Sequence, residues 1–216
     1  MHYRIKSGIV KSENAAKSTK EASAYLLGLL KQFGQFDQVL DYGCGKLRYA
    51  VHLQRQAKKL TLVDSDIQLS RPLDLFGTKT SIREFVRKNW PNTRVLDQRE
   101  FPSDRRRYDF ILCANVLSSI PANRTRLSIL RSFAKCLKRN GCCLVICQHT
   151  NSYFWSQMRN KSVKKVGDGF VKGDKDSLSF YGLIPPDRLR QLVLDAGLTI
   201  EKSWVNDQSC YIVATP

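Results

Sequence analysis

Two glycines, Gly43 and Gly45, lie just after an apolar run, inside the stretch VLDYGCG. Glycine tolerates positive φ angles and lets a ligand approach the backbone closely. Asp64, Asp97 and Asn115 each end a later apolar run. Carboxylate and amide oxygens at such positions can accept hydrogen bonds from ribose hydroxyls or an adenine amino group. Together these residues predict a nucleoside-binding site at the ends of successive strands.

A dinucleotide site is the first alternative. It requires the pattern G-x-G-x-x-G, but the residue three after Gly45 is Arg48. Asp41, just before the glycines, would repel a pyrophosphate and attract a cationic sulfonium ligand. The pattern favours a sulfonium nucleoside over NAD, and a dehydrogenase stays open as an alternative.

Strand-like and helix-like segments alternate along the chain, which predicts an α/β fold with a mostly parallel sheet. Apolar runs predict strands over 38–42, 59–64, 93–97, 108–115 and 142–148. Amphipathic spacing predicts helices over 12–31, 47–56, 80–90, 122–141 and 185–197. Segments 198–205 and 210–216 are expected to close the fold as an antiparallel hairpin. Little periodicity is found in 151–178, which we interpret as an insertion or lid.

The motif series resembles class I S-adenosylmethionine-dependent methyltransferases over about residues 36 to 215. The stretches that carry the resemblance are VLDYGCG, LVDSD, RVLDQREFP, YDFILCANVLSSI and LKRNGCCLVIC. The resemblance implies a single Rossmann-like domain with helices on both faces of a seven-stranded sheet. The implied strand order is 3-2-1-4-5-7-6, with the last strand antiparallel. We expect an N-terminal helical cap at 1–35, the methyltransferase domain at 36–216 and a basic lid at 151–180.

The resemblance also implies S-adenosylmethionine as cofactor and assigns residues to it. Gly43 and Gly45 would lie beneath the cofactor, and Asp41 would contact its methionine end. The remaining implied contacts are Asp64 to the ribose, Asp97 and Gln98 to the adenine, and Asn115 and Val116 near the donated methyl. Leu47 departs from the family, which often has a third glycine there. We therefore expect a backbone at Leu47 that suits a side chain.

Methyl transfer depends mainly on alignment and, for some nucleophiles, on a general base. His149, just after the fifth predicted strand, is the candidate base, with a hydrogen-bonded structural histidine as the alternative. Tyr181 precedes the last helix and is a candidate substrate-pocket residue. Tyr3 and Tyr25 are further candidates to close the site from the N-terminal segment.

The charge balance points to an anionic partner. Lys and Arg total 36 against 19 acidic residues, a net charge of +17. The predicted lid interleaves Tyr153, Phe154 and Trp155 with basic residues, a mixture that suits nucleotides. The alternative is that the lid aromatics pack on the core. Further lysines of the N-terminal segment add to this charge, namely Lys6, Lys11, Lys17 and Lys20.

Other functional classes are not favoured. The seven cysteines show no paired zinc spacing, so we expect no metal site. No apolar run suggests a membrane span or a secretory signal, so we expect a cytoplasmic protein. Three hypotheses follow: a methyltransferase acting on a nucleic acid or nucleotide, which we favour; one acting on a small anionic metabolite; and a non-catalytic partner or sensor module with the same fold.

Overall fold

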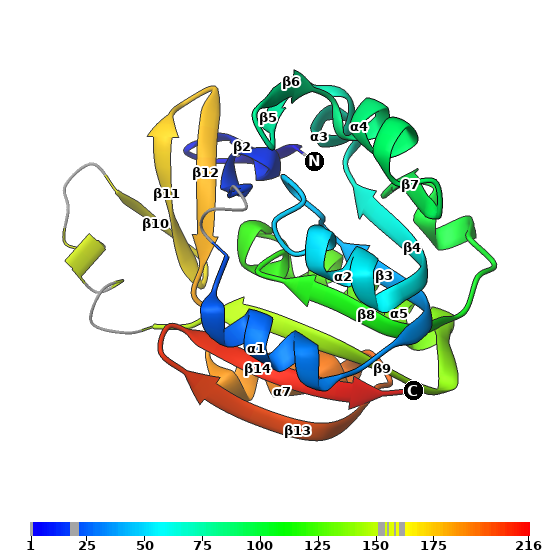
Figure 1. The fold of residues 1–216 in the computed structure, drawn as a ribbon. Helices are drawn as coiled ribbons and strands as arrows, with labels where there is room; N and C mark the ends of the chain where they lie inside the picture. The colour runs from blue at the N-terminus through cyan, green and yellow to red at the C-terminus, as the bar shows by residue number, and fades with distance from the viewer. Residues whose placement is uncertain (1, 18–21, 151–153, 155, 158, 160–162) are drawn as a thin grey trace. The chain divides into compact units, whose positions relative to one another are not determined.

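The computed structural model describes residues 2–17, 22–150, 154, 156–157, 159 and 163–216 (Figure 1). The chain divides into two compact units. The central unit is Ala16–Leu112, and the terminal unit combines Met1–Ala15 with Cys113–Pro216.

The largest sheet has seven strands in the order β13-β14-β9-β8-β3-β4-β7. In chain order they are β3 (Phe36–Tyr42), β4 (Ala57–Asp64), β7 (Thr93–Asp97), β8 (Tyr108–Ala114), β9 (Leu137–Gln148), β13 (Thr199–Asn206) and β14 (Ser209–Thr215). The seventh strand, β14, is antiparallel to both of its neighbours. Counted along the chain, this is the predicted order 3-2-1-4-5-7-6. The predicted α/β fold is therefore confirmed.

In the central unit, helices surround a short parallel sheet. β3 pairs in parallel with β4 and β8, and its inner residues Val39 and Leu40 are fully buried. The helices are α1 (Ala24–Gln32), α2 (Ala50–Gln56), α3 (Asp66–Ser70) and α4 (Ile82–Asn89), with a 3-10 turn η3 (Phe101–Ser103). A small hairpin joins β5 (Leu73–Leu75) to β6 (Thr78–Thr80). α2 packs on β3 and β4, and α4 packs on β7.

The terminal unit contains α5 (Asn123–Cys136), α7 (Pro186–Asp195) and the 3-10 turns η1 (Ser12–Ala15) and η4 (Leu117–Ser119). It also holds a second sheet, ordered β1-β2-β12-β11-β10 (Figure 1). Its strands are β1 (His2–Ile5), β2 (Gly8–Lys11), β10 (Lys164–Val166), β11 (Gly169–Asp174) and β12 (Ser177–Gly182). One face of this sheet buries Val10, Val171, Leu178 and Phe180 together.

The second sheet corrects two expectations. The predicted single helix over 12–31 is wrong, because η1 ends at Ala15 and α1 begins after its cap, Ser23. The segment expected as a helical cap starts instead with the β1–β2 hairpin. The expected lid, which has no clear periodicity, contributes three strands. Leu178 pairs with Val10, and such distant partners cannot be seen in a local pattern.

Two boundaries also differ from the prediction. The helix expected over 122–141 is shorter than predicted, because α5 ends at Cys136 and β9 already begins at Leu137. The helix expected from residue 47 begins at Ala50, after a turn.

Candidate cofactor site

The loop after β3 is held against the end of β4. The amides of Gly43 and Cys44 both donate to the carbonyl oxygen of Val63, at 2.7 and 3.1 Å. Gly43 and Gly45 have φ angles of 79° and 58°, in the region that favours glycine. The glycines are therefore required by the turn itself.

Leu47 corrects an expectation about this loop. Its φ angle is 62°, so its backbone keeps the left-handed conformation rather than one that suits a side chain. The side chain is fully buried. A residue other than glycine in the left-handed conformation destabilises the fold by about 1–2 kcal/mol. Burying a leucine side chain stabilises the fold by about 1.5–3 kcal/mol. Apolar packing thus offsets the strain at Leu47.

Asp64 ends β4 and faces the glycine loop. Its Oδ2 accepts a hydrogen bond from the amide of Gly45 at 2.9 Å, and its Oδ1 accepts one from the amide of Ser65 at 2.8 Å. Burial raises the pKa of Asp64 to about 6, despite the hydrogen bonds that favour the charged form.

Asp41 lies inside β3 and is 4% exposed. Its register partners are Leu62 of β4 and Leu112 of β8. Burial, reinforced by the nearby charge of Asp64, raises the pKa of Asp41 to about 7, and Arg48 partly counteracts this rise. The buried carboxyl of Asp41 and the half-buried carboxyl of Asp64 therefore make this end of the sheet a place where a cation is favourable.

Asp97 and Gln98 follow the neighbouring strand. Asp97 pairs in register with Asp64, and the amide of Gln98 donates to the carbonyl oxygen of Asp64 at 2.9 Å. The Asp97 carboxylate accepts a hydrogen bond from the Arg99 amide at 2.8 Å. The central unit thus brings together six predicted cofactor residues, namely Asp41, Gly43, Gly45, Asp64, Asp97 and Gln98.

Sequence reasoning missed Gln68, a fully buried residue of α3. Its amide nitrogen donates to the carbonyl oxygen of Gly45. Its Oε1 has no hydrogen-bond partner among the residues that the structure describes. Only its position four residues after Asp64 could have drawn attention to it.

Asn115 and Val116 lie in the terminal unit, just after β8. Asn115 has a φ angle of 61°, and its amide donates to the carbonyl oxygen of Ile146 at 2.8 Å. Its side-chain Oδ1 is buried and has no partner within the described part of the chain. A buried acceptor of this kind costs free energy unless a ligand or water satisfies it.

The candidate base His149 and the candidate substrate-pocket residue Tyr181 also lie in the terminal unit. The ring nitrogens of His149 each lie 2.9 Å from a backbone carbonyl oxygen, Nδ1 from Thr150 and Nε2 from Asp207. Carbonyl oxygens only accept hydrogen bonds, so to act as a general base His149 must turn one ring nitrogen away from its carbonyl oxygen and toward the substrate. The half-buried ring of Tyr181 stacks on Phe170, with centroids 5.1 Å apart.

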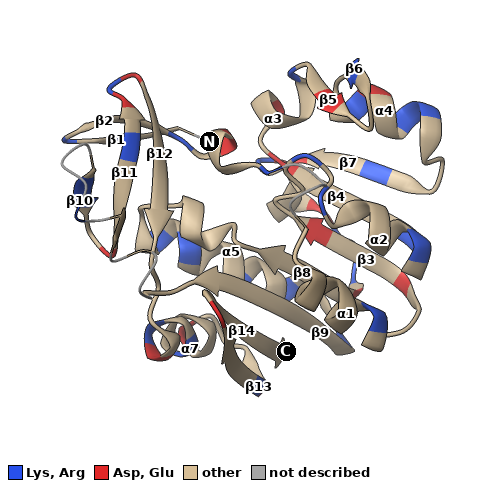
Figure 2. Ribbon diagram, turned by 60° about the vertical axis from the view of Figure 1, so that its left-hand side comes forward, with Lys and Arg blue, Asp and Glu red and all other residues tan. Residues whose placement is uncertain are grey.

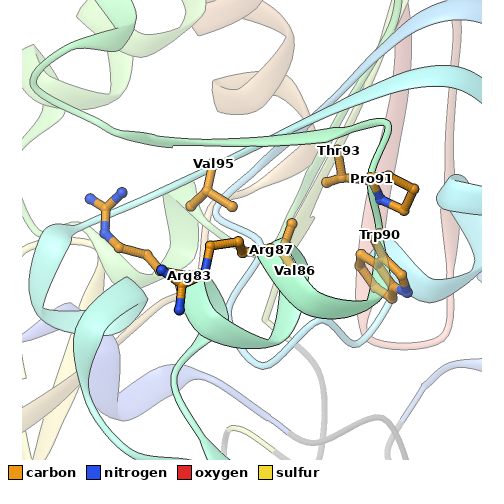
Figure 3. Close-up of a pocket in the computed structure, with 7 residues that line it drawn as sticks. All are labelled: Arg83, Val86, Arg87, Trp90, Pro91, Thr93 and Val95. Atoms are coloured by element: carbon orange, nitrogen blue, oxygen red, sulfur yellow. The ribbon is translucent and has the colours of Figure 1, made fainter.

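A hollow of about 350 Å³ lies elsewhere in the central unit, between α4 and β7 (Figure 3). It is lined by Arg83, Val86, Arg87, Trp90, Pro91, Thr93 and Val95. These residues include none of the predicted cofactor residues, so the hollow adds no member to the site.

The described residues contain no group of three or more potential metal ligands. Within the same part of the chain, no helix combines the length and apolar character that crossing a membrane requires. Tyr153, Trp155 and Lys20, which the sequence singled out, lie outside the described residues.

The chain is similar to known methyltransferases. A family model for the methyltransferase domain matches residues 14–203. The uncharacterized protein YmfD of Escherichia coli (strain K12) is 32% identical over 212 residues, which cover 98% of this chain and 95% of YmfD.

Two solved structures share the fold. One is an S-adenosylmethionine-dependent methyltransferase from Clostridium acetobutylicum ATCC 824, with a TM-score of 0.64, 14% identity, and coverage of 94% of this chain and 93% of that chain. The other is DhpI in a SAM–HEP complex, with a TM-score of 0.63, 16% identity, and coverage of 89% and 86%. The family model, which spans most of the sequence, decides the assignment. The chain belongs to the class I S-adenosylmethionine-dependent methyltransferase family.

Proposed function

We propose that this methyltransferase binds S-adenosylmethionine through the residues that the resemblance assigned. Asp64 would hold the ribose hydroxyls, while Asp97 and Gln98 would contact the adenine. The other proposed contacts are Asp41, Gly43 and Gly45 near the methionine end, and Asn115 and Val116 near the methyl group.

The contacts of Asp64 carry this proposal. Each of its two carboxylate oxygens accepts one backbone N–H, from Gly45 or Ser65. A carboxylate has about four lone-pair sites, so both oxygens can accept a further hydrogen bond. A ribose diol supplies two hydroxyl donors, which matches that remaining capacity.

The charges of the site also fit the cofactor. Burial raises the pKa values of Asp41 and Asp64, so a cation beside them would stabilise their ionised forms. The unpartnered acceptors on Gln68 and Asn115 provide further places for donors. When bound, the cofactor supplies an electrophilic methyl group on a positively charged sulfur. Asp41 would favour that charge, and His149 is proposed to accept a proton from the substrate nucleophile.

For the substrate we propose a nucleic acid or nucleotide. In the second sheet, side chains alternate between faces along each strand. The register places Arg4, Lys11, Lys165 and Lys172 on the face opposite the Val10–Phe180 cluster, and we call these four residues the basic sheet face. Figure 2 shows Lys and Arg positions in blue on these strands.

Aromatic rings accompany this charge. Tyr181 and Phe170 are register partners on the same face as Lys165. Phe154 is buried against Phe170 and Leu183. For Phe154, this packing agrees with the alternative that the sequence left open, in which lid aromatics cover the core. Tyr181 is therefore the aromatic residue that we propose for stacking on a base.

The test is transfer of tritiated methyl groups to pools of RNA, DNA, nucleotides and small metabolites. Labelling of nucleic acid would support the proposal, and labelling of metabolites alone would favour the small-molecule alternative. Cofactor binding without labelling of any pool would favour a non-catalytic module.

Salt dependence separates a phosphate-backbone binder from a small-molecule site. Four contacts to the phosphates of a single-stranded nucleic acid predict that affinity falls by about 50-fold between about 50 and 200 mM salt. Replacing all four residues of the basic sheet face with Gln should remove most of this dependence. A matched variant would neutralise four exposed cations of the central unit, namely Lys88, Arg105, Arg106 and Arg107. An equal loss of salt dependence in both variants would contradict a role for the basic sheet face.

A further inference from the structure

Arg126 of α5 is an arginine whose side chain is fully buried. Its Nε donates to the carbonyl oxygens of Leu117 at 3.0 Å and Ile120 at 2.8 Å. Its Nη1 also donates to Oδ1 of Asn123 at 3.0 Å. The guanidinium group therefore donates hydrogen bonds to carbonyl oxygens at both ends of the η4 turn.

The same guanidinium binds the second sheet. Both of its terminal nitrogens donate to the carboxylate of Asp168, in the turn between β10 and β11, with Nη2 to Oδ1 at 3.0 Å. A Cβ added to Gly182 of β12 would lie 2.8 Å from Nη2, so the sheet packs closely on this group. The planar fork of arginine suits such paired contacts.

The η4 turn follows Asn115 and Val116 directly. The carbonyl oxygen of Val116 accepts hydrogen bonds from the amide of Ser119 at 2.9 Å and from its hydroxyl at 2.8 Å. Asn115 itself is held at a φ angle of 61° with a buried, unpartnered Oδ1. Asparagine enters this left-handed region more readily than most residues, so what the surrounding structure must fix is the position of the buried Oδ1.

We propose that the Arg126–Asp168 pair is a positioning device for the cofactor. The pair holds η4 in place, and η4 keeps Asn115 in the conformation that presents its amide oxygen. Arg126 touches no cofactor residue through its guanidinium contacts, so it acts through the turn. The inference rests on the proposed function, because that proposal assigns Asn115 to the cofactor.

The test begins with Asp168→Asn in the full-length chain. Asparagine keeps the shape of the side chain but replaces one acceptor oxygen with an N–H donor, so the paired contact with the two terminal nitrogens of Arg126 is lost. Loss of one hydrogen bond to the charged guanidinium should weaken cofactor binding by about tenfold. Calorimetry measures the cofactor Kd. In the ligand-free protein, hydrogen exchange at the Ser119 and Ile120 amides should become faster. Asp168→Glu keeps the charge and should recover part of the affinity, and it also covers the case in which Asp168→Asn does not fold.

Asp104→Asn is the matched control. It breaks an ion pair with Arg94, whose Nη1 lies 3.1 Å from the Asp104 carboxylate in the central unit. Cofactor affinity and exchange in η4 should stay at wild-type values in this variant. Loss of affinity in both variants would reveal a general effect of stability and overturn the proposal.

A double-mutant cycle with Asn115→Ala separates positioning from mere stability. If the pair acts through Asn115, adding Asp168→Asn to Asn115→Ala should weaken binding no further. Effects that multiply would overturn the inference, as would wild-type affinity in Asp168→Asn. If the wild-type protein binds no S-adenosylmethionine, the proposed function fails and the inference fails with it.

Discussion

The Oδ2 atom of Asp64 accepts a hydrogen bond from the backbone amide of Gly45 over 2.9 Å. One carboxylate thereby fixes the glycine loop after β3 to the end of β4. The loop is organised before any ligand arrives, which lowers the entropy cost of binding.

Asp64→Asn should weaken cofactor binding by about 10- to 100-fold, because hydrogen bonds to a charged group are lost. Calorimetry with S-adenosylhomocysteine measures the change. Asp66→Asn is the control, since Asp66 is exposed and pairs with Arg83 instead. Equal affinity in wild type and Asp64→Asn would contradict the assignment of Asp64 to the ribose.

Cofactor affinity should rise with pH. The pKa values of about 7 for Asp41 and about 6 for Asp64 mean that both carboxyls are largely protonated in the free protein at pH 5. A cationic sulfonium favours the ionised forms. As the pH is lowered below the pKa of each group that must ionise, affinity should therefore fall by up to about tenfold per pH unit. Titrations from pH 5 to 8 check this, with S-adenosylhomocysteine, whose sulfur is neutral, showing a shallower dependence. A flat profile for S-adenosylmethionine would exclude both carboxyls from the interaction.

The same carboxyls affect folding stability in the opposite direction. Their pKa values are raised in the folded state, so the stability they contribute is complete below about pH 4 and lost as pH rises through 6 and 7. Added cofactor should therefore increase Tm most above pH 7. Thermal unfolding with and without S-adenosylmethionine at pH 5 and 8 measures this difference.

Substitutions at Leu47 should reverse the usual preference for alanine over glycine. Leu47→Ala loses buried contacts at a cost of about 2–5 kcal/mol and keeps the left-handed strain. Leu47→Gly loses the same contacts but removes strain of about 1–2 kcal/mol. Glycine should therefore be the less destabilising of the two in urea unfolding. At Leu53, buried on α2, alanine should be the milder change. If alanine were less destabilising than glycine at both positions, the backbone strain inferred at Leu47 would be contradicted.

His149→Gln should lower kcat by about 10²- to 10⁴-fold if His149 is the general base, with little change in cofactor Kd. Single-turnover methyl transfer to the substrate identified by labelling is the measurement. His52→Gln, on α2, serves as the control. An unchanged kcat would leave His149 in a structural role, held by its two carbonyl contacts.

Much of the fold follows from local pattern. β7 occupies the predicted residues 93–97, because its apolar run has clear ends in Trp90-Pro91-Asn92 and Gln98. The predicted residues Asp64 and Asp97 do lie side by side in register. Parallel strands bring their carboxyl ends to one edge, and the strand order implied by the resemblance makes these two strands neighbours.

The sequence by itself determined the alternation of strands and helices and the residues at the strand ends, because apolar periodicity and motif spacing are local properties. The order of the strands was implied by the resemblance to the methyltransferase family. Only the tertiary structure decided the second sheet, where Val10 pairs with Leu178. It also decided that Leu47 keeps a glycine-like backbone and that Arg126 is buried against Asp168. These features depend on packing between distant segments, and local sequence preferences do not encode which distant groups will satisfy a strained backbone or a buried charge.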